Sequence, residues 1–600
     1  MSYQIKQSLQ NVLAGKFFPI VTALIAVALT FGTLETGLQL DDYYHQHKLQ
    51  QDDLLSDNGG ILTNLFNFMH GSTNDYDRGL KSVHLPWWTA RELKIKFFRP
   101  IAAMTHWLDY RLWPEKPSMM HLHSLFWLSA MVMITALFYR RMLTPLWVAG
   151  LAGLLFAIDD AHGVPAGWLA NRNSLIAATF GFLSLYCHDR WRRGGWRAGA
   201  LFGPVLFVIS LLSAEAGLGA GAYFFAYEVF MGKGGWRKRA VSFAPYVLVV
   251  VVWWISYKTM GFGTFASGAY IDPGRNPLNY LQHLMERVPV LLYGQWFFPD
   301  AMTYLLIPEP IIYGVLAVIY LLIAGLAVLF VPLLKHNAAS RFFALGMVLS
   351  LLPVCATFPH NRLLLFAGFG AFGLLAQFLA YWLEQAAWFP ANQSWRILAK
   401  VSMVVLIIVH LIIAPLLLTR TSRMQAWIES VVLGKPLSQL SRDHEIAEKD
   451  LIFINPPDAF ITIVYSKAIC KELKLQMPRV TYALSSGMTS SMTIRRVDEK
   501  SLEITPDIGF ISTDVDRLFR DETHPMQVGD RVKSGDMTAE VISLTKDKRP
   551  LCVRFTFSKP LEDSSLAFFA WKNDDYGYAP FAMPDIGHSK HLKVAKVPLI

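Results

Sequence analysis

Long apolar stretches separated by short polar segments occupy the first two thirds of the chain. The hydrocarbon core of a bilayer, about 30 Å thick, needs about 20 apolar residues in helical conformation. Eleven stretches approach or reach that length, so we expect about eleven transmembrane helices. They are Phe17–Leu38, Leu122–Phe138, Leu143–Ile158, Ser174–Cys187, Ala198–Leu212, Gly217–Met231, Val241–Tyr257, Ile311–Leu334, Phe342–Phe358, Leu363–Leu383 and Val401–Leu418. The pattern predicts a polytopic α-helical membrane protein.

Two of the apolar stretches need a closer look. Phe17–Leu38 is long and is followed by no small-residue cleavage site, so we expect a permanent span instead of a cleaved signal peptide. Asn279–Phe298 contains Glu286, Arg287 and Pro289. We therefore expect it to form a helix that lies at the outer interface or re-enters the membrane.

The pattern changes near residue 420. Partial alternation of apolar and polar residues, with Gly, Asp and Pro between, predicts strands at Leu502–Ile511, Met537–Leu544 and Pro550–Ser558. Ala459–Leu475 has the character of a helix. We expect a transmembrane domain over 1–420, with long outer loops at 39–120 and 258–309, and a soluble α+β domain, rich in strands, over 421–600.

Composition supports this division. Only 17% of the 600 residues are charged, against about 25% in soluble proteins, which argues against a water-soluble enzyme. From Thr421 onwards 24 basic residues balance 24 acidic ones, so the net charge of +10 belongs entirely to the apolar part. A nucleic-acid-binding protein would carry its basic excess on a polar domain, so we expect no nucleic-acid partner.

The basic residues lie mainly in alternate loops. Sixteen lysines and arginines fall on one side of the predicted spans, against only Asp189 and Glu384. By the positive-inside rule that side is cytoplasmic. We expect a multi-pass protein of the cytoplasmic (inner) membrane, in contact with membrane lipids, whose N-terminus is cytoplasmic and whose C-terminal domain is extracytoplasmic.

Polar and charged residues gather at the outer ends of the predicted spans. They are Asp41, Asp42, Asp159, Asp160, His162, Asn171, Arg172, Glu215, His360, Asn361 and Arg362. Each alone is consistent with a solvated loop, but ionisable groups near membrane depth commonly line a functional cavity. Because adjacent spans pack together, we expect these residues to surround one outward-facing pocket.

Two residue types in this set point to group transfer. One carboxylate of the Asp41–Asp42 pair is suited to accept a proton, because like charges close together raise one pKa. The guanidinium groups of Arg172 and Arg362 are suited to bind a phosphate through charge-assisted hydrogen bonds. This combination at a membrane surface suggests transfer of a group from a lipid phosphate.

Six segments carry a resemblance to a known family. They are DDYYHQH (Asp41–His47), FFRPIAAMTHWLDYRLW (Phe97–Trp113), HLHSLFWL (His121–Leu128), FAIDDAHGVPAGWLANRNSLIA (Phe156–Ala177), LLSAEAGL (Leu211–Leu218) and LLPVCATFPHNRLLLFAGFG (Leu351–Gly370). In order and topology the chain resembles the GT-C glycosyltransferases over roughly residues 17–380. It is most similar to the branch of the tetratricopeptide-repeat O-mannosyltransferases and their bacterial relatives.

The chain departs from the motifs of that branch at several positions. Asp159–Asp160 replaces a His-Pro pair, Ala214 replaces a lysine before the retained Glu215, and Asn361 replaces a glutamate before the retained Arg362. The polar tail contains no tetratricopeptide repeat. Mannose and a protein acceptor therefore do not carry over to this chain.

The resemblance implies an inverting glycosyltransferase that uses a polyprenyl-phosphate-linked sugar outside the cytoplasmic membrane. Asp41 would be the general base with Asp42 beside it, and Arg172, Arg362 and Arg99 would bind the donor phosphate. For Arg99, a cation at the lipid interface is an equal alternative. The pocket would include Asp159, Asp160, His162, Asn171, Glu215, His360 and Asn361. The acceptor, whether glycan, lipid or protein, stays open.

Several alternatives remain. The histidines at 45, 47, 121 and 123 make a divalent cation possible, but their i, i+2 spacing does not place two ligands on one helix face, so we expect no required cofactor and no metal site. A flippase for a lipid-linked glycan would show charges deep within spans, and a non-catalytic scaffold would leave the Asp pair unexplained. Cys470 and Cys552 are equally consistent with a disulfide and with two thiols.

Overall fold

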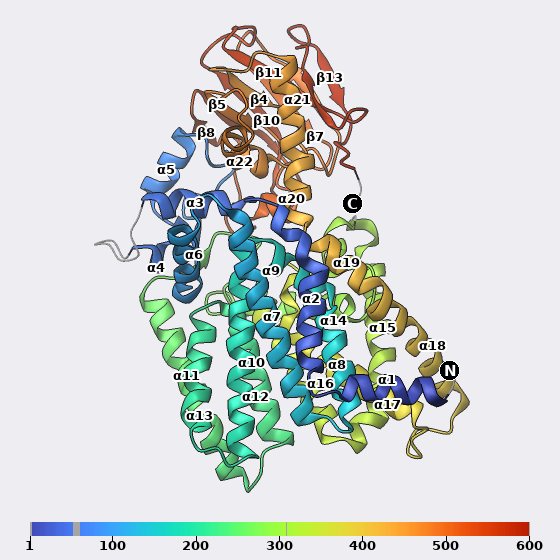
Figure 1. Ribbon diagram of the computed structural model, residues 1–600. Helices are drawn as coiled ribbons and strands as arrows, with labels where there is room; N and C mark the ends of the chain where they lie inside the picture. The colour runs from blue at the N-terminus through green and yellow to red at the C-terminus, as the bar shows by residue number, and fades with distance from the viewer. Residues whose placement is uncertain (1–2, 52–59, 308, 599–600) are drawn as a thin grey trace. The chain divides into compact units, whose positions relative to one another are not determined.

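The computed structural model describes residues 3–51, 60–307 and 309–598. The chain divides into two compact units (Figure 1). The first unit comprises Met1–Phe66, Phe98–Phe262 and Pro273–Gln425. The second comprises Asn67–Phe97, Gly263–Asp272 and Ala426–Ile600. Parts of both long outer loops therefore fold with the polar tail.

The first unit is built of helices. They are α1 (Tyr3–Ala14), α2 (Phe18–Thr30), η1 (Phe31–Glu35), α3 (Asp41–Gln51), α4 (Gly60–Asn64), α6 (Pro100–Leu112), α7 (Pro117–Met142), α8 (Leu146–Ala157), η2 (Asp160–His162), α9 (Gly163–Gly167), η3 (Leu169–Asn171), α10 (Arg172–Arg192), α11 (Gly199–Leu211), η4 (Glu215–Gly217), α12 (Leu218–Phe230), α13 (Trp236–Thr259), α14 (Pro277–Trp296), η5 (Ala301–Leu306), α15 (Glu309–His336), α16 (Ala338–Val354), η6 (Asn361–Leu363), α17 (Leu365–Leu383), α18 (Gln393–Ile408), η7 (Val409–Ile413) and α19 (Ala414–Thr421). The α20 helix (Met424–Glu429) continues into the second unit.

Six helical segments among the described residues are long and apolar enough to cross a membrane, as in a multi-pass membrane protein. A seventh results if α8 and α9, which are bent by 47°, form one broken span. The predicted count of about eleven is not confirmed. The other predicted spans are helical, but α11 and α12 have only 13 residues each, and α10 contains Arg172, Asp189, Arg190 and Arg192.

The α17 helix lies at the centre of the helical unit. In its most apolar window 89% of the residues are buried, against 22% for α13 and α15. Glycines permit close packing here: a Cβ on Gly370 would lie 2.5 Å from the carbonyl oxygen of Phe343. The aromatic rings of Phe343 and Tyr223 fill the space around Phe369, with ring centroids 5.3 and 4.9 Å away.

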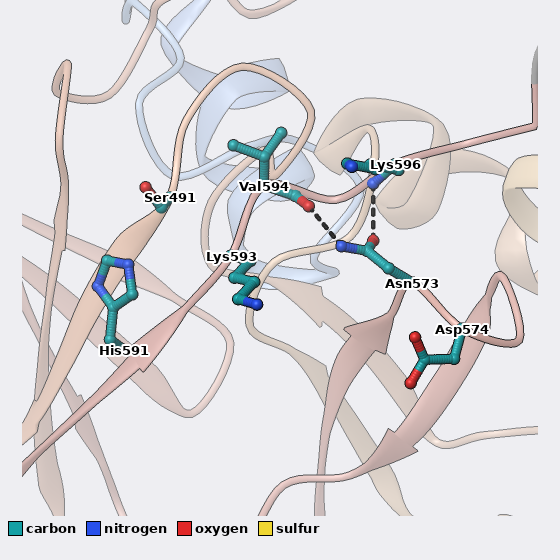
Figure 2. A pocket seen from close by; sticks show the side chains of 7 residues that line it. All are labelled: Ser491, Asn573, Asp574, His591, Lys593, Val594 and Lys596. Carbon is teal, nitrogen blue, oxygen red and sulfur yellow. Dashed lines mark hydrogen bonds between the residues drawn. The ribbon is translucent and has the colours of Figure 1, made fainter.

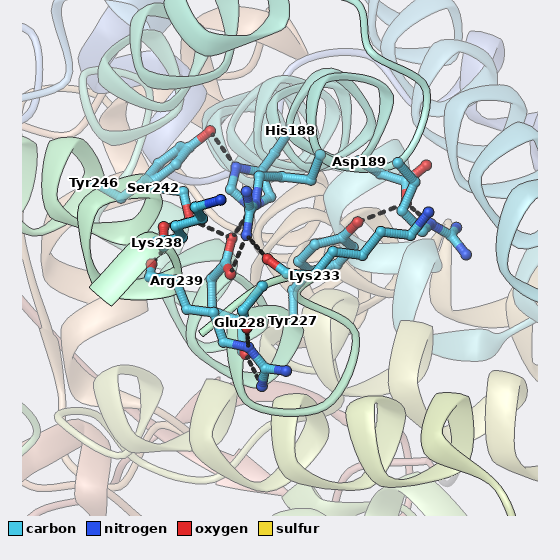
Figure 3. Close-up of polar contacts among 12 residues, drawn as sticks. His188, Asp189, Tyr227, Glu228, Lys233, Lys238, Arg239, Ser242 and Tyr246 are labelled. Atoms are coloured by element: carbon cyan, nitrogen blue, oxygen red, sulfur yellow. Dashed lines mark hydrogen bonds and ion pairs between the residues drawn. The ribbon is translucent and has the colours of Figure 1, made fainter. Parts of the chain in front are cut away.

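A buried polar network joins α10, α12 and α13 (Figure 3). The Glu228 carboxylate accepts hydrogen bonds from Arg192 at 2.9 Å and Ser242 at 2.8 Å, and lies 3.0 Å from His188 Nε2. The other ring nitrogen of His188 lies 3.0 Å from the Tyr246 hydroxyl. Buried charges are tolerated only when paired and hydrogen-bonded. The network therefore fixes which ends of these three helices meet.

The second unit contains three sheets. Its strands are β1 (Asn67–His70), β2 (Lys94–Lys96), β3 (Gly263–Phe265), β4 (Asp450–Phe453), β5 (Val480–Ala483), β6 (Met492–Arg496), β7 (Ser501–Pro506), β8 (Arg531–Ser534), β9 (Met537–Leu544), β10 (Pro550–Phe557), β11 (Leu566–Lys572), β12 (Gly577–Pro580) and β13 (Ser589–Leu592). Its helices are α5 (Thr73–Lys81), η8 (Ser430–Gly434), α21 (Lys435–Asp443), α22 (Ala459–Glu472) and α23 (Asp514–Arg517). The strand orders are β1-β2-β3, β13-β6-β7-β10-β9-β8 and β12-β11-β4-β5.

The four-stranded sheet combines two pairing modes. Strand β4 pairs in parallel with β5 on one side and with β11 on the other, whereas β12 runs antiparallel to β11. The crossover from β4 to β5 passes through α22, because parallel neighbours cannot be joined by a tight turn.

The predicted β-rich, α+β character of the tail is confirmed. Strands β9 and β10 match two of the predicted ranges almost to the residue, and α22 matches the predicted helix. Along β9 the residues Met537, Ala539 and Val541 are buried and alternate with more exposed ones, as period-2 patterning requires. Cys470 and Cys552 are separate thiols.

The segment Asn67–Phe97 supplies two tryptophans to the core of the second unit. Trp87 and Trp88 are 2% and 1% exposed. The indole N–H of Trp87 donates to the Leu484 carbonyl, and that of Trp88 to the Asp516 carbonyl, both at 3.0 Å. Each tryptophan thus buries its ring and satisfies its one donor.

We expect Trp88→Ala to destabilise the second unit by about 3–5 kcal/mol, because it removes a fully buried ring. Thermal denaturation and limited proteolysis of the purified chain measure this change. Val528→Ala, at a side chain that is 63% exposed, is the control and should shift stability by less than about 0.5 kcal/mol. Equal melting temperatures of the two variants would contradict the role given to Trp88.

Candidate functional site

A short segment of the first unit, Asp159–Asn171, connects most of the predicted site residues. We call it the 159–171 segment; it comprises η2, α9 and η3 and ends where α10 begins. Three parts of the first unit hold it in place: the start of α3, the end of α19, and the loop before α17. Each attachment is a specific contact.

The first attachment is Asp42, which is 2% exposed. Its carboxylate accepts hydrogen bonds from the backbone N–H of Ala170 at 2.7 Å and of Gln39 at 3.0 Å. The chain enters α3 through Leu40, whose φ of 46° is unusual for a residue with a side chain. Asp42 thus fixes the turn before α3 and holds the start of α3 against η3. The neighbouring Asp41 is half-buried.

The second attachment is a close backbone approach to α19. A Cβ on Gly167 would lie 1.7 Å from the carbonyl oxygen of Ser422, and one on Gly163 would lie 1.9 Å from Thr421 Oγ1. The Thr421 hydroxyl also donates to the carbonyl of Asp160 at 3.2 Å. Only glycine permits this approach, because any side chain would collide with the other backbone.

The third attachment involves Asn361. Its amide nitrogen donates to the Asp160 carboxylate at 2.7 Å, and its amide oxygen accepts from the N–H of Ala301 at 2.9 Å. The neighbouring Arg362 places its guanidinium over the rings of Trp168 at 5.6 Å and Phe358 at 5.9 Å. The indole N–H of Trp168 donates to the carbonyl of Gln39 at 3.3 Å.

His360 orients the start of η6. Its ring nitrogen Nδ1 accepts from the N–H of Arg362 at 3.2 Å. Burial lowers the pKa of His360 well below its usual range, and the positive charge of Arg362 lowers it further. The imidazole is therefore neutral at neutral pH, as an acceptor at Nδ1 requires.

Asp159 and His162 lie deeper in the segment. Asp159 is 3% exposed and borders Gly368 of α17, where a Cβ would lie 3.0 Å from its Oδ2 atom. His162 is fully buried against Phe156, with ring centroids 4.7 Å apart. Neither nitrogen of His162 has a hydrogen-bond partner within the part of the chain that the structure describes. Asn171 donates to the Ser174 hydroxyl at 3.2 Å.

Arg172 has a different environment. Its guanidinium is fully buried and donates to the Asp109 carboxylate, to Ser124 Oγ at 2.8 Å and to the carbonyl of Met120 at 2.7 Å. His123 Nδ1 lies 2.7 Å from the other Asp109 oxygen. In this structure Arg172 therefore joins α10 to α6 and α7, and its donors are directed at protein acceptors.

Arg99 and Glu215 form a second cluster. The guanidinium of Arg99 donates to Glu215 at 2.8 Å from Nε, and its second nitrogen lies 2.7 Å from the same oxygen. The Tyr257 hydroxyl donates to the other oxygen of Glu215 at 3.2 Å. Both charged side chains are partly exposed, at 19% and 26%, so the pair borders open space.

The structure thus brings Asp42, Asp160, Asn361 and Arg362 together through the 159–171 segment. It places Arg172 in a buried ion pair and Arg99 with Glu215 in a separate cluster. Sequence reasoning gave no role to Asp109 or Tyr257 and did not place Trp168 against Arg362. Asp109 lies in the motif Phe97–Trp113. Nothing in that motif indicates that the partner of Asp109 is Arg172 of α10.

The described residues contain no group of three or more His, Cys, Asp or Glu side chains arranged to hold a metal ion. Three of the four histidines that suggested one have other contacts. His45 packs against His106, with ring centroids 5.3 Å apart, His121 Nε2 lies 2.8 Å from the Gly37 carbonyl oxygen, and His123 contacts Asp109.

No protein-family model matches the sequence, and no curated protein matches it. Solved structures of the oligosaccharyltransferase from Archaeoglobus fulgidus are similar to the chain. The structure tethered to an acceptor peptide with the NVT sequon has 12% identity and a TM-score of 0.39 over 78% of this chain. The AglB structure with an inhibitory peptide and dolichol-phosphate has 12% identity and a TM-score of 0.40 over 80%.

A third structure of that enzyme, in complex with Zn and sulfate, has 11% identity and a TM-score of 0.36 over 77% of this chain. The chain spans 62–65% of the length of these proteins, less than two thirds.

We expect Gly167→Ala to displace the 159–171 segment, because the new methyl group would overlap the Ser422 carbonyl. Overpacking of this kind costs about 1–3 kcal/mol, and thermal denaturation of the solubilised protein measures it. Gly325→Ala in α15 is the matched control, since a Cβ there meets nothing within 4 Å. A Gly167→Ala variant as stable as this control would show that the close approach is unimportant.

Proposed function

We propose that the protein is an inverting glycosyltransferase that moves a sugar from a polyprenyl-phosphate-linked donor to an acceptor at the outer face of the cytoplasmic membrane. One observation carries the proposal. Trp168, beneath the Arg362 guanidinium, and Ala170, bonded to Asp42, belong to the same short segment. A half-buried carboxylate next to Asp42 and a phosphate-binding cation are thereby held at fixed positions on one scaffold.

In the proposed reaction Asp41 accepts the proton of the acceptor hydroxyl. The acceptor oxygen attacks the anomeric carbon of the sugar, and the bond from that carbon to the phosphate oxygen breaks. Polyprenyl phosphate leaves with the electron pair of that bond. Arg362 stabilises the charge that develops on the phosphate, as a positioned guanidinium does in phosphoryl chemistry.

Arg99 with Glu215 and Tyr257 is proposed as a second polar wall of the pocket, because the Arg99 and Glu215 side chains are 19% and 26% exposed. Arg172 is proposed to act through its ion pair with Asp109, by fixing α10 at the end of the 159–171 segment. Asp159, Asp160, His162, Asn171, His360 and Asn361 are proposed to shape the pocket and orient Arg362.

The proposed topology has eleven crossings and a cytoplasmic N-terminus. It adds α10 and the shorter helices α11, α12 and α16 to the six long apolar segments, and counts α8 with α9 as one broken span. The acceptor is a glycan, a lipid or a protein. The reaction as written requires no cofactor, and dialysis against a chelator before assay tests for dependence on a divalent cation.

We expect Asp41→Asn to fold and insert normally but to lower the transfer rate by about 10²–10⁴-fold, the usual loss on removing a general base. Membrane-purified protein assayed with a polyprenyl-phosphate sugar measures it. Glu115→Gln, an exposed carboxylate of the same outer loop, is the control. Full activity in Asp41→Asn would rule out the mechanism, and a flippase or a scaffold would then be the better hypothesis.

Asp42→Asn is expected to act differently, because each oxygen of Asp42 accepts from one backbone N–H and asparagine has only one acceptor oxygen. A buried donor left without an acceptor costs about 1–3 kcal/mol, so this variant should lose thermal stability together with activity, whereas Asp41→Asn should lose activity alone. The pair of variants separates the base from the residue that positions it.

We expect Arg362→Ala to weaken donor binding by roughly 10- to 100-fold, because a charge-assisted contact of about 1.5–3 kcal/mol is lost. Arg362→Lys should restore only part of this, since lysine lacks the planar fork. Titration with the lipid-linked donor measures the affinity. Arg111→Ala is the matched control, as Arg111 is also stacked on a tryptophan, Trp107, at 5.4 Å; equal affinity in Arg362→Ala and wild type would remove Arg362 from the site.

The topology has a direct test. A reporter that is active only outside the cytoplasm, fused after Ile600, should be active. The sixteen basic residues retain their loops in the cytoplasm, and the C-terminal domain is expected on the opposite side of the membrane. Activity of a cytoplasm-only reporter at the same position would contradict the orientation.

A further inference from the structure

The second unit contains a pocket at the carboxyl edge of its four-stranded sheet (Figure 2). The pocket encloses about 430 Å³ and is lined by Ser491, Asn573, Asp574, His591, Lys593, Val594 and Lys596. This volume lies within the range of small-molecule sites, which measure about 300–1,000 Å³.

The position of the pocket follows from the topology of the sheet. Strand β4 leads through α22 to β5 on one side, and β11 pairs in parallel on its other side, so the carboxyl ends of all three strands lie at one edge. Asn573 and Asp574 come directly after β11. Ligands of open α/β sheets bind beyond this edge, where neighbouring strands connect in opposite directions.

The wall of the pocket is a preformed piece of backbone. The side chain of Asn573 donates to the carbonyl of Val594 and accepts from the N–H of Lys596, both at 2.8 Å. The indole N–H of Trp571 donates to the carbonyl of Lys596 at 2.9 Å, and the N–H of Ala595 donates to the carbonyl of Gly487 at 2.8 Å. Four hydrogen bonds therefore hold residues 594–596 against the ends of β11 and of the loop after β5.

The other wall comes from the six-stranded sheet. His591 lies on β13 and Lys593 directly follows that strand, while Ser491 directly precedes β6, with which β13 pairs. The pocket thus lies where the ends of two sheets meet. Its side chains combine three nitrogen-bearing groups, at His591, Lys593 and Lys596, with the Asp574 carboxylate and the Ser491 hydroxyl (Figure 2).

We propose that this pocket binds an anionic sugar, such as a sugar that carries a carboxylate or a phosphate. The two ammonium groups and the imidazole would bind the anionic substituent, and Asp574 and Ser491 would accept and donate hydrogen bonds to ring hydroxyl groups. A neutral sugar would leave the lysine charges uncompensated, and a bare anion would be repelled by Asp574. The site does not depend on the reaction proposed for the first unit.

The test uses the full chain in lipid nanodiscs and titrates four probes: glucuronate, glucose 1-phosphate, inorganic phosphate and glucose. We expect one of the two sugar anions to bind more tightly than both inorganic phosphate and glucose, and which of them binds identifies the substituent. Replacement of both lysines, Lys593→Ala with Lys596→Ala, should weaken that binding about 10-fold or more.

Asp574→Ala gives a test of opposite sign. It should weaken binding of the sugar anion, whose hydroxyl groups lose an acceptor, and strengthen binding of inorganic phosphate, which no longer meets a like charge. Lys590→Ala is the matched control: Lys590 lies on β13 beside His591 but lines no part of the pocket, and its ammonium group lies 4.9 Å from the Phe581 ring. Glucose binding as tightly as the sugar anions, absence of sugar-anion binding, or an equal loss in Lys590→Ala would overturn the proposal.

Discussion

The arrangement of the first unit depends on one buried carboxylate. Asp42 is 2% exposed and accepts hydrogen bonds from the backbone N–H groups of Gln39 and Ala170. A buried polar group is costly unless it is hydrogen-bonded, so the chain must bring these two segments together to satisfy it. If the start of α3 and the 159–171 segment separated, Asp42 would lose the hydrogen bond from Ala170.

The small residues of the 159–171 segment make the other contacts possible. Gly163 and Gly167 let the backbone touch the end of α19, and Asp160 then lies within reach of Asn361. Arg362 rests on Trp168 from the same segment. A segment attached at three points has little freedom to move, and the group-transfer site that we propose requires such preorganisation, because its reacting groups must be positioned before the reaction.

Both units contain buried charged side chains that are paired, but the elements that these pairs join differ. In the first, Arg172 and Glu228 are buried and surrounded by specific partners, which sets the positions of α6, α7, α10, α12 and α13. In the second, Glu503 lies between Arg495 and Arg554 on the polar face of the six-stranded sheet, at 2.7 and 2.8 Å. Glu503 is 6% exposed, whereas the Arg495 and Arg554 side chains are 50% and 34% exposed. The core of that unit also contains buried rings such as Trp87 and Trp88.

The sequence by itself determined the many apolar helices of the first unit, the β-rich tail and several of its strands, because apolar length and period-2 alternation are local properties. It also predicted Asp41, Asp42 and Arg362 as site residues, since they lie at the ends of predicted apolar helices. Tertiary structure alone decided that Arg172 pairs with Asp109, 63 residues away, that Trp168 lies under Arg362, and that both outer loops contribute to the second unit. Those pairings depend on which helix ends meet in space, and the spacing of residues along the chain does not specify which ends meet.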